Sequence, residues 1–96
     1  MSLNKTYAVF GLGRYGFSVA KELINSGAEV IAIDNDETRV NLAASELPFC
    51  KCADTTDIEV LKRLGISNVD TVIIAIGENI ESSVMSVMLC KELGVK

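Results

Sequence analysis

The residues of this chain with the clearest chemical potential are three glycines and one acidic residue. Gly11, Gly13 and Gly16 stand at the spacing G-x-G-x-x-G, directly after the apolar run at 7–10. In a strand–turn–helix unit, the first glycine permits a tight turn, the second lets the backbone approach a phosphate, and the third lets the helix pack against the strand. Asp34 closes the next apolar run, where a carboxylate accepts hydrogen bonds from ribose hydroxyls and repels a 2′-phosphate. The pattern therefore predicts a nucleotide site.

The alternative interpretation of these glycines is that they serve only the packing of a helix. We favour the nucleotide because strand, turn, helix, strand and acidic residue follow one another in the order that such a site requires. The N-terminus of the helix would also offer unpaired N–H groups and the positive end of its dipole to phosphate oxygens.

The composition argues against several other kinds of chemistry. The chain has no histidine and therefore no Ser-His or Cys-His nucleophile pair. Its three cysteines, Cys50, Cys52 and Cys90, are an odd number, which argues against a disulfide framework, and they are fewer than the four ligands of a usual zinc site. We expect all three to be small buried hydrophobic residues, and we expect no metal site.

The charge and hydropathy pattern narrows the range of partners. The net charge is −4 without any basic run, which argues against nucleic acid and anionic lipid as partners. No apolar run approaches the roughly 20 residues of a transmembrane helix, and the N-terminus has no signal-peptide pattern. We therefore expect a cytoplasmic protein that does not insert into lipid.

Apolar runs and amphipathic runs alternate along the 96 residues. Four short apolar runs read as strands, at 7–10, 29–34, 49–53 and 71–77. Each is followed by a run with apolar residues at helical spacing, and these helices are expected to end near Gly27, Pro48, Gly65 and Gly94. Thr56 with Glu59 fits a capping box at the start of the third helix. The run at 71–77 is apolar almost throughout, so we expect that strand to be buried on both faces.

This alternation predicts an α/β fold with a parallel sheet and right-handed crossovers. We expect a single domain over residues 1–96: a Rossmann-like doubly wound sheet of four βα units in the strand order 3-2-1-4. Residues 1–4 are expected to be a flexible start. The end of the chain from Gly94 on reads like the entry to a fifth strand, so the domain is expected to be cut short there, as a fragment or as a short natural form.

Several motifs taken together resemble a known family. "FGLGRYG", "AIDND", "CADTTD" and "VIIAIGENIESS" are similar to the nucleotide-binding lobe of RCK domains, also called TrkA N-terminal domains. These domains are the cytosolic regulatory units of prokaryotic potassium channels and of Trk and Ktr potassium uptake systems. The resemblance covers residues 5–95, and "GLGRYG" with "ELINSG" and "LCKELGV" is closest to the Ktr-type regulatory subunit.

The resemblance implies a function. It implies a domain that is not an enzyme and that binds an adenine nucleotide, ATP, ADP or NAD(H). The bound nucleotide would gate a potassium-translocating membrane protein by conformational linkage, from the inner face of the membrane. The domain would also form a homo-oligomer, either a dimer or a larger ring.

The resemblance further implies which positions bind the nucleotide. They lie in the glycine loop and at the ends of the second, third and fourth strands: Gly11, Leu12, Gly13, Arg14, Tyr15, Gly16, Asp34, Asn35, Arg39, Ala53, Asp54, Thr55, Ile76 and Gly77. Arg14 would approach the terminal phosphates, Asp34 would hold the ribose and Asp54 would lie beside the adenine. Arg14 and Arg39 could instead be solvated surface charges, and Asp54 could instead be the N-cap of the third helix.

A second class of function is the cofactor-binding half of an NAD-dependent dehydrogenase. Such an enzyme needs a substrate domain and an acid or base near the nicotinamide. The chain has no histidine and no room for a substrate domain, so we favour the regulatory sensor.

The fourth helix carries more apolar residues than one contact with a sheet can cover. One stripe holds Ile80, Val84, Val87 and Met88, while other apolar residues spill toward a second stripe, Met85, Leu89 and Leu93. The surplus could be buried by a fifth strand and its helix, or by another subunit. We expect at least a dimer, with Met85 and Leu89 near its contact.

Overall fold

The computed structural model describes residues 5–76 and 80–94, with the side chains at all of these positions except 80–83. Three expectations fall outside this range: the flexible start at 1–4, the nucleotide contact at Gly77 and the start of a fifth strand at 95–96.

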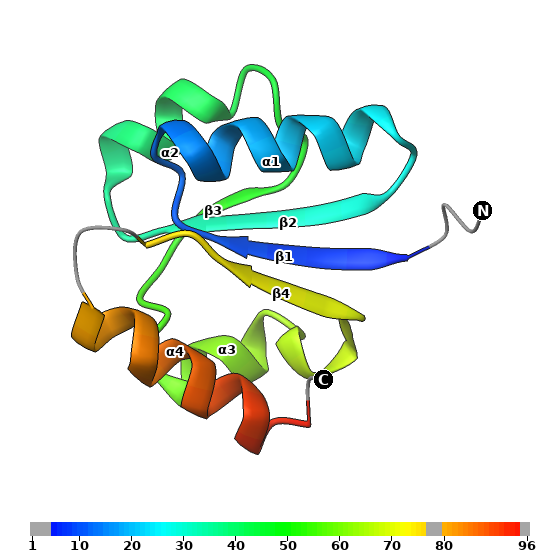
Figure 1. The fold of residues 1–96 in the computed structure, drawn as a ribbon. Helices are drawn as coiled ribbons and strands as arrows, with labels where there is room; N and C mark the ends of the chain where they lie inside the picture. Colours follow the sequence, from blue (N-terminus) through cyan, green and yellow to red (C-terminus); the bar gives the residue numbers. More distant parts are fainter. Residues whose placement is uncertain (1–4, 77–79, 95–96) are drawn as a thin grey trace.

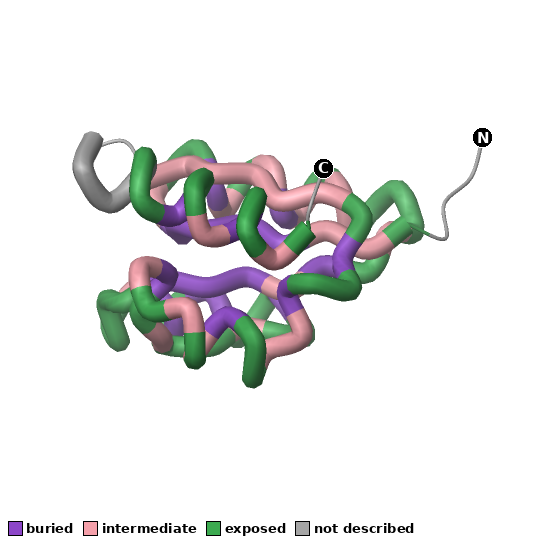
Figure 2. Tube along the Cα trace, turned by 90° about the horizontal axis from the view of Figure 1, so that it is seen from below, coloured by how far each residue is buried: buried purple, intermediate pink, exposed green. Residues whose placement is uncertain are grey.

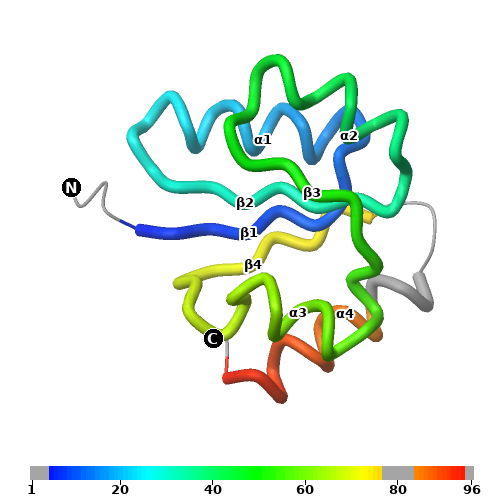
Figure 3. Tube along the Cα trace, turned by 180° about the vertical axis from the view of Figure 1, so that it is seen from behind, coloured from blue at the N-terminus to red at the C-terminus, as the bar shows by residue number. Residues whose placement is uncertain are grey.

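The chain folds into four βα units around one sheet. In chain order the elements are β1 (Thr6–Phe10), α1 (Arg14–Asn25), β2 (Glu29–Asp34), α2 (Glu37–Ala43), β3 (Cys50–Cys52), α3 (Ile58–Arg63), the 3-10 helix η1 (Ile66–Asn68), β4 (Thr71–Ile74) and α4 (Ile80–Glu92). The strands are parallel and lie in the order β3-β2-β1-β4. Helices α1 and α2 cover one face of the sheet, and α3 and α4 cover the other (Figures 1 and 3). The predicted Rossmann-like doubly wound sheet is thereby confirmed.

β1 is the central strand and joins two separate cores. It pairs with 29–33 of β2 on one side and with 71–74 of β4 on the other. Successive side chains of a strand point to opposite faces, so Ala8 and Phe10 enter one core while Val9 enters the other. The buried residues of the α3/α4 core are Ala8, Phe10, Ile33, Leu61, Ile66, Val69 and Cys90. Those of the α1/α2 core are Val9, Leu12, Ala20, Val30, Ala32, Val40, Ala43 and Leu47. In Figure 2 the exposed residues follow the outer turns and loops, with the buried ones inside.

Aspartates determine where two of the helices begin. Asp36 caps α2 by accepting a hydrogen bond from the backbone N–H of Thr38 at 2.9 Å. Asp57 caps α3 in the same way, with Glu59 N–H as donor at 3.0 Å. The predicted capping box of Thr56 with Glu59 is therefore wrong, because an aspartate one position later supplies the cap that the threonine was expected to supply.

The two outer strands differ from their predictions in length and burial. β3 is shorter than the apolar run at 49–53, and β4 ends at Ile74 instead of Gly77. All four residues of β4 are only half-buried, so the expected burial on both faces is wrong. The reason is the position of β4, which pairs with β1 alone and forms one edge of the sheet within the described residues.

Helix α4 contacts the sheet through a different stripe from the one the apolar pattern suggests. Ser86 and Cys90 are buried, and Leu89 and Leu93 pack against the α3/α4 core. The exposed apolar side chains are instead Val84, Met85, Val87 and Met88. Of the two residues expected near a subunit contact, Met85 is exposed and Leu89 is half-buried against the core, and the contact itself stays a prediction. The core stripe was missed because its first member, Ser86, is polar.

Only one of the three cysteines is fully buried. Cys90 lies in the α3/α4 core, Cys50 is half-buried, and Cys52 is exposed on the short edge strand β3. Burial raises the pKa of the Cys50 and Cys90 thiols. The expectation that all three are buried is wrong for Cys52, whose thiol donates a weak hydrogen bond to the Asn35 carbonyl at 3.6 Å.

The packing of α1 against the glycine loop generates a first prediction. A Cβ atom at Gly16 would collide with the carbonyl oxygen of Gly11 and lie 3.2 Å from Ala75 Cβ. We expect Gly16→Ala to lower the free energy of unfolding by about 1–3 kcal/mol, because the loop must shift to admit the methyl group. Urea denaturation followed by circular dichroism measures this change.

The matched control for this substitution is Gly13→Ala. The backbone φ of Gly13 is −69°, and the nearest atom to an added Cβ is Arg39 Nη1 at 4.0 Å. This variant should unfold close to the wild-type midpoint. A Gly16→Ala variant as stable as Gly13→Ala would contradict the close packing described here.

Candidate functional site

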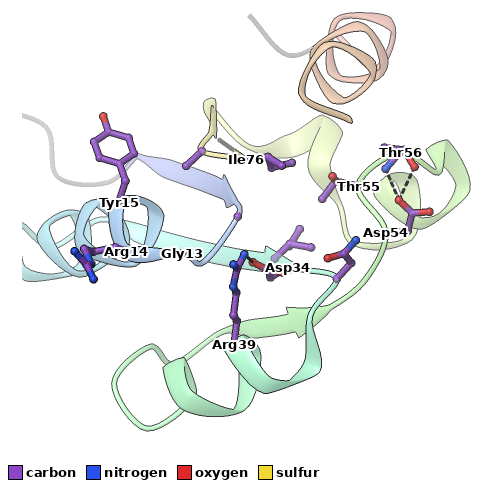
Figure 4. A pocket seen from close by; sticks show the side chains of 13 residues that line it. Gly13, Arg14, Tyr15, Asp34, Arg39, Asp54, Thr55, Thr56 and Ile76 are labelled. Atoms are coloured by element: carbon purple, nitrogen blue, oxygen red, sulfur yellow. Dashed lines mark hydrogen bonds and ion pairs between the residues drawn. The ribbon is translucent and has the colours of Figure 1, made fainter. Parts of the chain in front are cut away.

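A pocket of about 400 Å³ opens at the carboxyl ends of the strands. The strand order reverses between β1 and β4, and ligands of open α/β sheets bind at such a switch point. The pocket is lined by Gly11, Gly13, Arg14, Tyr15, Ile33, Asp34, Asn35, Arg39, Asp54, Thr55, Thr56, Ala75 and Ile76. Figure 4 shows side chains from α1, α2 and the loop after β3 arranged around it.

The glycine loop forms the floor of the pocket between β2 and β4. Gly11 donates its N–H to the Ile33 carbonyl at 2.7 Å and has a φ of +101°, which side chains rarely tolerate. A Cβ at Gly11 would also lie 2.7 Å from the Ala75 carbonyl oxygen. The loop is thus held close against both neighbouring strands, as the first glycine of the motif requires.

Helix α1 presents its N-terminus to the pocket. Gly13 is the N-cap residue and has no side chain with which to cap the helix, and the first turn contains no acidic residue. The first N–H groups of a helix lack intrahelical acceptors, and together with the helix dipole they favour a bound anion. This end of the pocket therefore suits the phosphates of a nucleotide.

Asp34 joins the glycine loop to the loop that follows β2. Its side chain is only 5% exposed. One carboxylate oxygen, Oδ2, accepts the N–H of Leu12 at 2.7 Å, and the other, Oδ1, accepts the N–H of Asp36 at 2.8 Å. Each carboxylate oxygen can accept more than one hydrogen bond, so both retain capacity for ribose hydroxyls.

Arg39 reaches from α2 into the same space. Its Nη1 lies 3.7 Å from Asp34 Oδ2, and its Nε lies 3.9 Å from Asp36 Oδ2. Figure 4 shows the Arg39 side chain directed toward Asp34, whereas Arg14 lies along α1 on the other side of Gly13. The pocket therefore has one cation beside the buried carboxylate and a second, exposed one at the start of α1.

Asp54 forms the turn at the opposite end of the pocket. Its Oδ1 accepts the backbone N–H of Thr56 at 2.8 Å and also the hydroxyl of Thr56. The bond from the Thr56 hydroxyl contributes most and the bond from the Thr56 N–H next, and together they lower the pKa of the Asp54 carboxyl. Because Asp57 caps α3, the alternative that Asp54 is the N-cap of that helix is wrong.

The structure brings together most of the positions named from the sequence. Those that line the pocket are Gly11, Gly13, Arg14, Tyr15, Asp34, Asn35, Arg39, Asp54, Thr55 and Ile76. Leu12 and Gly16 are buried, and Ala53 packs against the α3/α4 core, so these three do not line it. Three lining residues were not named as site residues, namely Ile33, Thr56 and Ala75. Each of these residues is adjacent in the sequence to a residue that was named. Their position near the end of a strand was the only feature of the sequence that could have identified them.

In the ranges 5–76 and 80–94, no three His, Cys, Asp or Glu side chains gather closely enough to hold a metal ion. No helix within those ranges has the length and apolar character needed to cross a membrane.

Comparison with protein families and curated sequences gives a consistent result. The family described as the TrkA-N domain matches residues 7–96. The Ktr system potassium uptake protein C of Bacillus subtilis is 48% identical over 97% of this chain, and the Ktr system potassium uptake protein A of the same organism is 46% identical over 96%. The matched regions are 42% and 41% of those proteins, so the chain spans less than half of their length.

Comparison with solved structures supports the fold. The NAD(P)-binding domain of an exopolyphosphatase-related protein from Archaeoglobus fulgidus superposes with a TM-score of 0.80 at 26% sequence identity. The match covers 91% of this chain and 65% of that one.

The buried position of Asp34 generates a second prediction. In Asp34→Asn the amide has only one oxygen, so its NH₂ group must face either the N–H of Leu12 or that of Asp36. We expect the free energy of unfolding to fall by about 1–3 kcal/mol, because one backbone donor loses its acceptor. Urea denaturation at neutral pH measures the loss.

Asp36→Asn is the matched control, since it makes the same chemical change two residues away. Asparagine caps a helix as well as aspartate does, so this variant should stay within about 0.5 kcal/mol of wild type. If both variants lose equal stability, a general effect of charge, not the Asp34 bridge, accounts for the result.

Proposed function

The chain belongs to the TrkA-N domain family, and from this premise we propose that it binds an adenine nucleotide and regulates a potassium-translocating membrane protein. The observation that carries the nucleotide part is the Asp34 carboxylate, which lies next to the glycine loop at the switch point of the sheet. The potassium part is supported by the printed names of the two Bacillus relatives. Because the chain spans under half of their length, the transport partner and its regulation are proposed for the whole protein.

The lining of the pocket supports one proposed orientation of the nucleotide. The adenine lies at the Asp54 turn, where a carboxylate can accept from the adenine amino group. The ribose lies against Asp34, and the phosphates extend toward Gly13 and the N-terminus of α1. Arg14 then lies nearest the terminal phosphates, where its guanidinium favours the more highly charged ligand.

The proposed mechanism is linkage without catalysis. A bound nucleotide shifts a conformational equilibrium only by the difference between its affinities for the two conformations. ATP, ADP and NAD(H) share adenine and ribose, so Asp34 and Asp54 treat them alike. Discrimination must come from the end of the pocket at Arg14. The domain would work in the cytoplasm, held at the inner face of the membrane through its partner.

The dehydrogenase alternative has weaker support. The solved neighbour is an NAD(P)-binding domain, which fits either function, but the two Bacillus relatives are named as potassium uptake proteins. The lining residues include carboxylates and arginines but no histidine to relay a proton beside a nicotinamide. Measurable hydride transfer by the purified chain would revive this alternative.

The exposed face of α4 supports a homo-oligomer. Val84, Met85, Val87 and Met88 are between 43% and 61% exposed, which leaves a continuous apolar stripe uncovered. We propose that a second copy of the chain covers it, in keeping with the dimers and rings that the RCK resemblance implies.

The nucleotide proposal predicts a ranking of ligands. Isothermal titration with ATP, ADP, AMP, NADH and NADPH should give micromolar dissociation constants for the ligands with a free 2′-hydroxyl. NADPH should bind at least about tenfold more weakly, because Asp34 repels its 2′-phosphate. No NADH should be consumed. NADPH binding as tight as NADH would defeat the argument from Asp34.

Two arginine variants serve as controls in the same titrations. Arg14→Ala should weaken ATP more than AMP, by about 1–3 kcal/mol, if the guanidinium pairs with phosphate oxygens. Arg39→Ala should instead widen the gap between NADH and NADPH, because it removes the cation that offsets the charge of Asp34. Equal losses for all ligands in both variants would show that the arginines only shape the loop.

The proposal for α4 predicts the state of assembly. Light scattering should find the wild-type chain as a dimer or larger, and Val87→Asp with Met88→Asp should give a folded monomer that still binds ADP. Leu42→Asp is the control, since Leu42 is 72% exposed on α2 and should leave assembly unchanged. A wild-type chain that is monomeric at high concentration would contradict the contact and leave the stripe to be covered by other parts of a longer protein.

A further inference from the structure

A buried pair of hydroxyl groups connects the pocket to α4. Thr55 lies in the loop after β3 and lines the pocket, yet its side chain is only 7% exposed. Ser86 lies at the middle of α4 and is fully buried. Their hydroxyl oxygens are 2.9 Å apart, and Ser86 Oγ is also 3.2 Å from the backbone carbonyl oxygen of Thr55.

The directions of these two hydrogen bonds follow from the number of protons available. A serine hydroxyl donates a single proton, so if Ser86 donates to the Thr55 carbonyl it must accept from the Thr55 hydroxyl. This assignment satisfies both contacts at once. Within the described residues, every buried side-chain nitrogen or oxygen has a hydrogen-bond partner, so the pair is a completed unit. In a low-dielectric core, loss of the Ser86 hydroxyl would leave the Thr55 hydroxyl without its acceptor, whereas loss of the Thr55 hydroxyl would leave Ser86 with only its bond to the Thr55 carbonyl.

The position of Ser86 on its helix gives the pair a consequence for α4. The side chains that α4 turns toward the α3/α4 core are Ser86, Leu89, Cys90 and Leu93, which lie at the spacing i, i+3, i+4, i+7. Apolar contacts permit a helix to slide or rotate a little, whereas a pair of hydrogen bonds fixes its register. Ser86 is therefore the point at which α4 is aligned to the loop that carries Asp54.

The neighbours of Ser86 on α4 are part of the exposed apolar stripe. Met85 and Val87 flank it in the sequence and are both 43% exposed. Because Ser86 is hydrogen-bonded to Thr55, a small movement of the Thr55 loop would also move Ser86. The exposed apolar stripe of α4, which is proposed to contact a second subunit, would then change its orientation.

Resting on the proposed nucleotide function, we propose that Ser86 is a positioning residue that couples occupancy of the pocket to α4. A nucleotide whose adenine lies against Asp54 and Thr55 fixes the loop after β3. The loop, through the reciprocal hydroxyl pair, then fixes α4. Ser86 touches no ligand itself and acts only through Thr55.

The experiment is hydrogen exchange followed by mass spectrometry, with saturating ADP and without it. In the wild-type chain, ADP should slow amide exchange both in the glycine loop at 11–17 and in α4 at 84–94. Ser86→Ala should bind ADP about threefold to tenfold more weakly, and saturating ADP should still protect 11–17 but no longer 84–94. Ser67→Ala makes the same chemical change at an exposed serine of η1 and should behave as wild type.

Variants at Thr55 keep the test informative if Ser86→Ala folds poorly. Thr55→Val removes the hydroxyl at nearly constant volume and should weaken the coupling to α4, because Ser86 then keeps only its bond to the Thr55 carbonyl. Thr55→Ser keeps the hydroxyl and should respond as wild type. The double variant Thr55→Val with Ser86→Ala should be no more uncoupled than Ser86→Ala alone, because that change already removes both hydrogen bonds.

Three results would overturn the inference. Full protection of 84–94 by ADP in both Ser86→Ala and Thr55→Val would show that the pair only packs the core. ADP binding to the wild-type chain without any response of α4 would refute the coupling while leaving the proposed function intact. Absence of ADP binding to the wild-type chain would overturn the proposed function, and the coupling with it.

Discussion

The carboxylate of Asp34 is the group on which the geometry of the pocket depends. A buried charge is costly unless hydrogen bonds surround it, and here two backbone N–H groups and a nearby guanidinium meet it. These contacts tie the turn after β1 to the turn after β2, so neither can move without disturbing the other. The same carboxylate is the one expected to face a ribose, and the binding surface is thus held in place before any ligand arrives.

Much of this arrangement follows from the sequence alone. β1, β2 and β4 are short apolar runs, α1 has a clear apolar face, and glycines follow α1, α3 and α4, so local chemistry already indicates the order of elements. The glycine spacing then locates the pocket, because only residues without a Cβ fit where Gly11 meets Ala75 and where Gly16 meets Gly11. Right-handed crossovers alone allow more than one strand order, and the order 3-2-1-4 follows from the Rossmann-like character of the glycine motif.

Two of the wrong predictions share a physical cause, because in each a polar side chain pairs with a group far away in the sequence or lies one position from the expected residue. Asp57 displaced Thr56 as the cap of α3 because both were acceptable capping residues. Ser86 was left out of the core face of α4 because its burial depends on a hydroxyl 31 positions away. The contact of Arg39 with Asp34 could not be distinguished from a surface charge, since helical spacing does not say which way a long side chain turns.

The two cores on either face of the sheet give the pocket a further property. Each core packs under its own pair of helices while β1 and β2 supply side chains to both, so the helices on either face are the parts that can open locally at their own free-energy cost. The pocket draws Asp34 and Arg39 from one side, and Asp54 and Ile76 from the other. A ligand that spans it must be released when either half opens, so occupancy raises the cost of both openings by mass action. Bound ligand would thereby couple the local openings of the helices on the two faces of the sheet, which would otherwise occur independently.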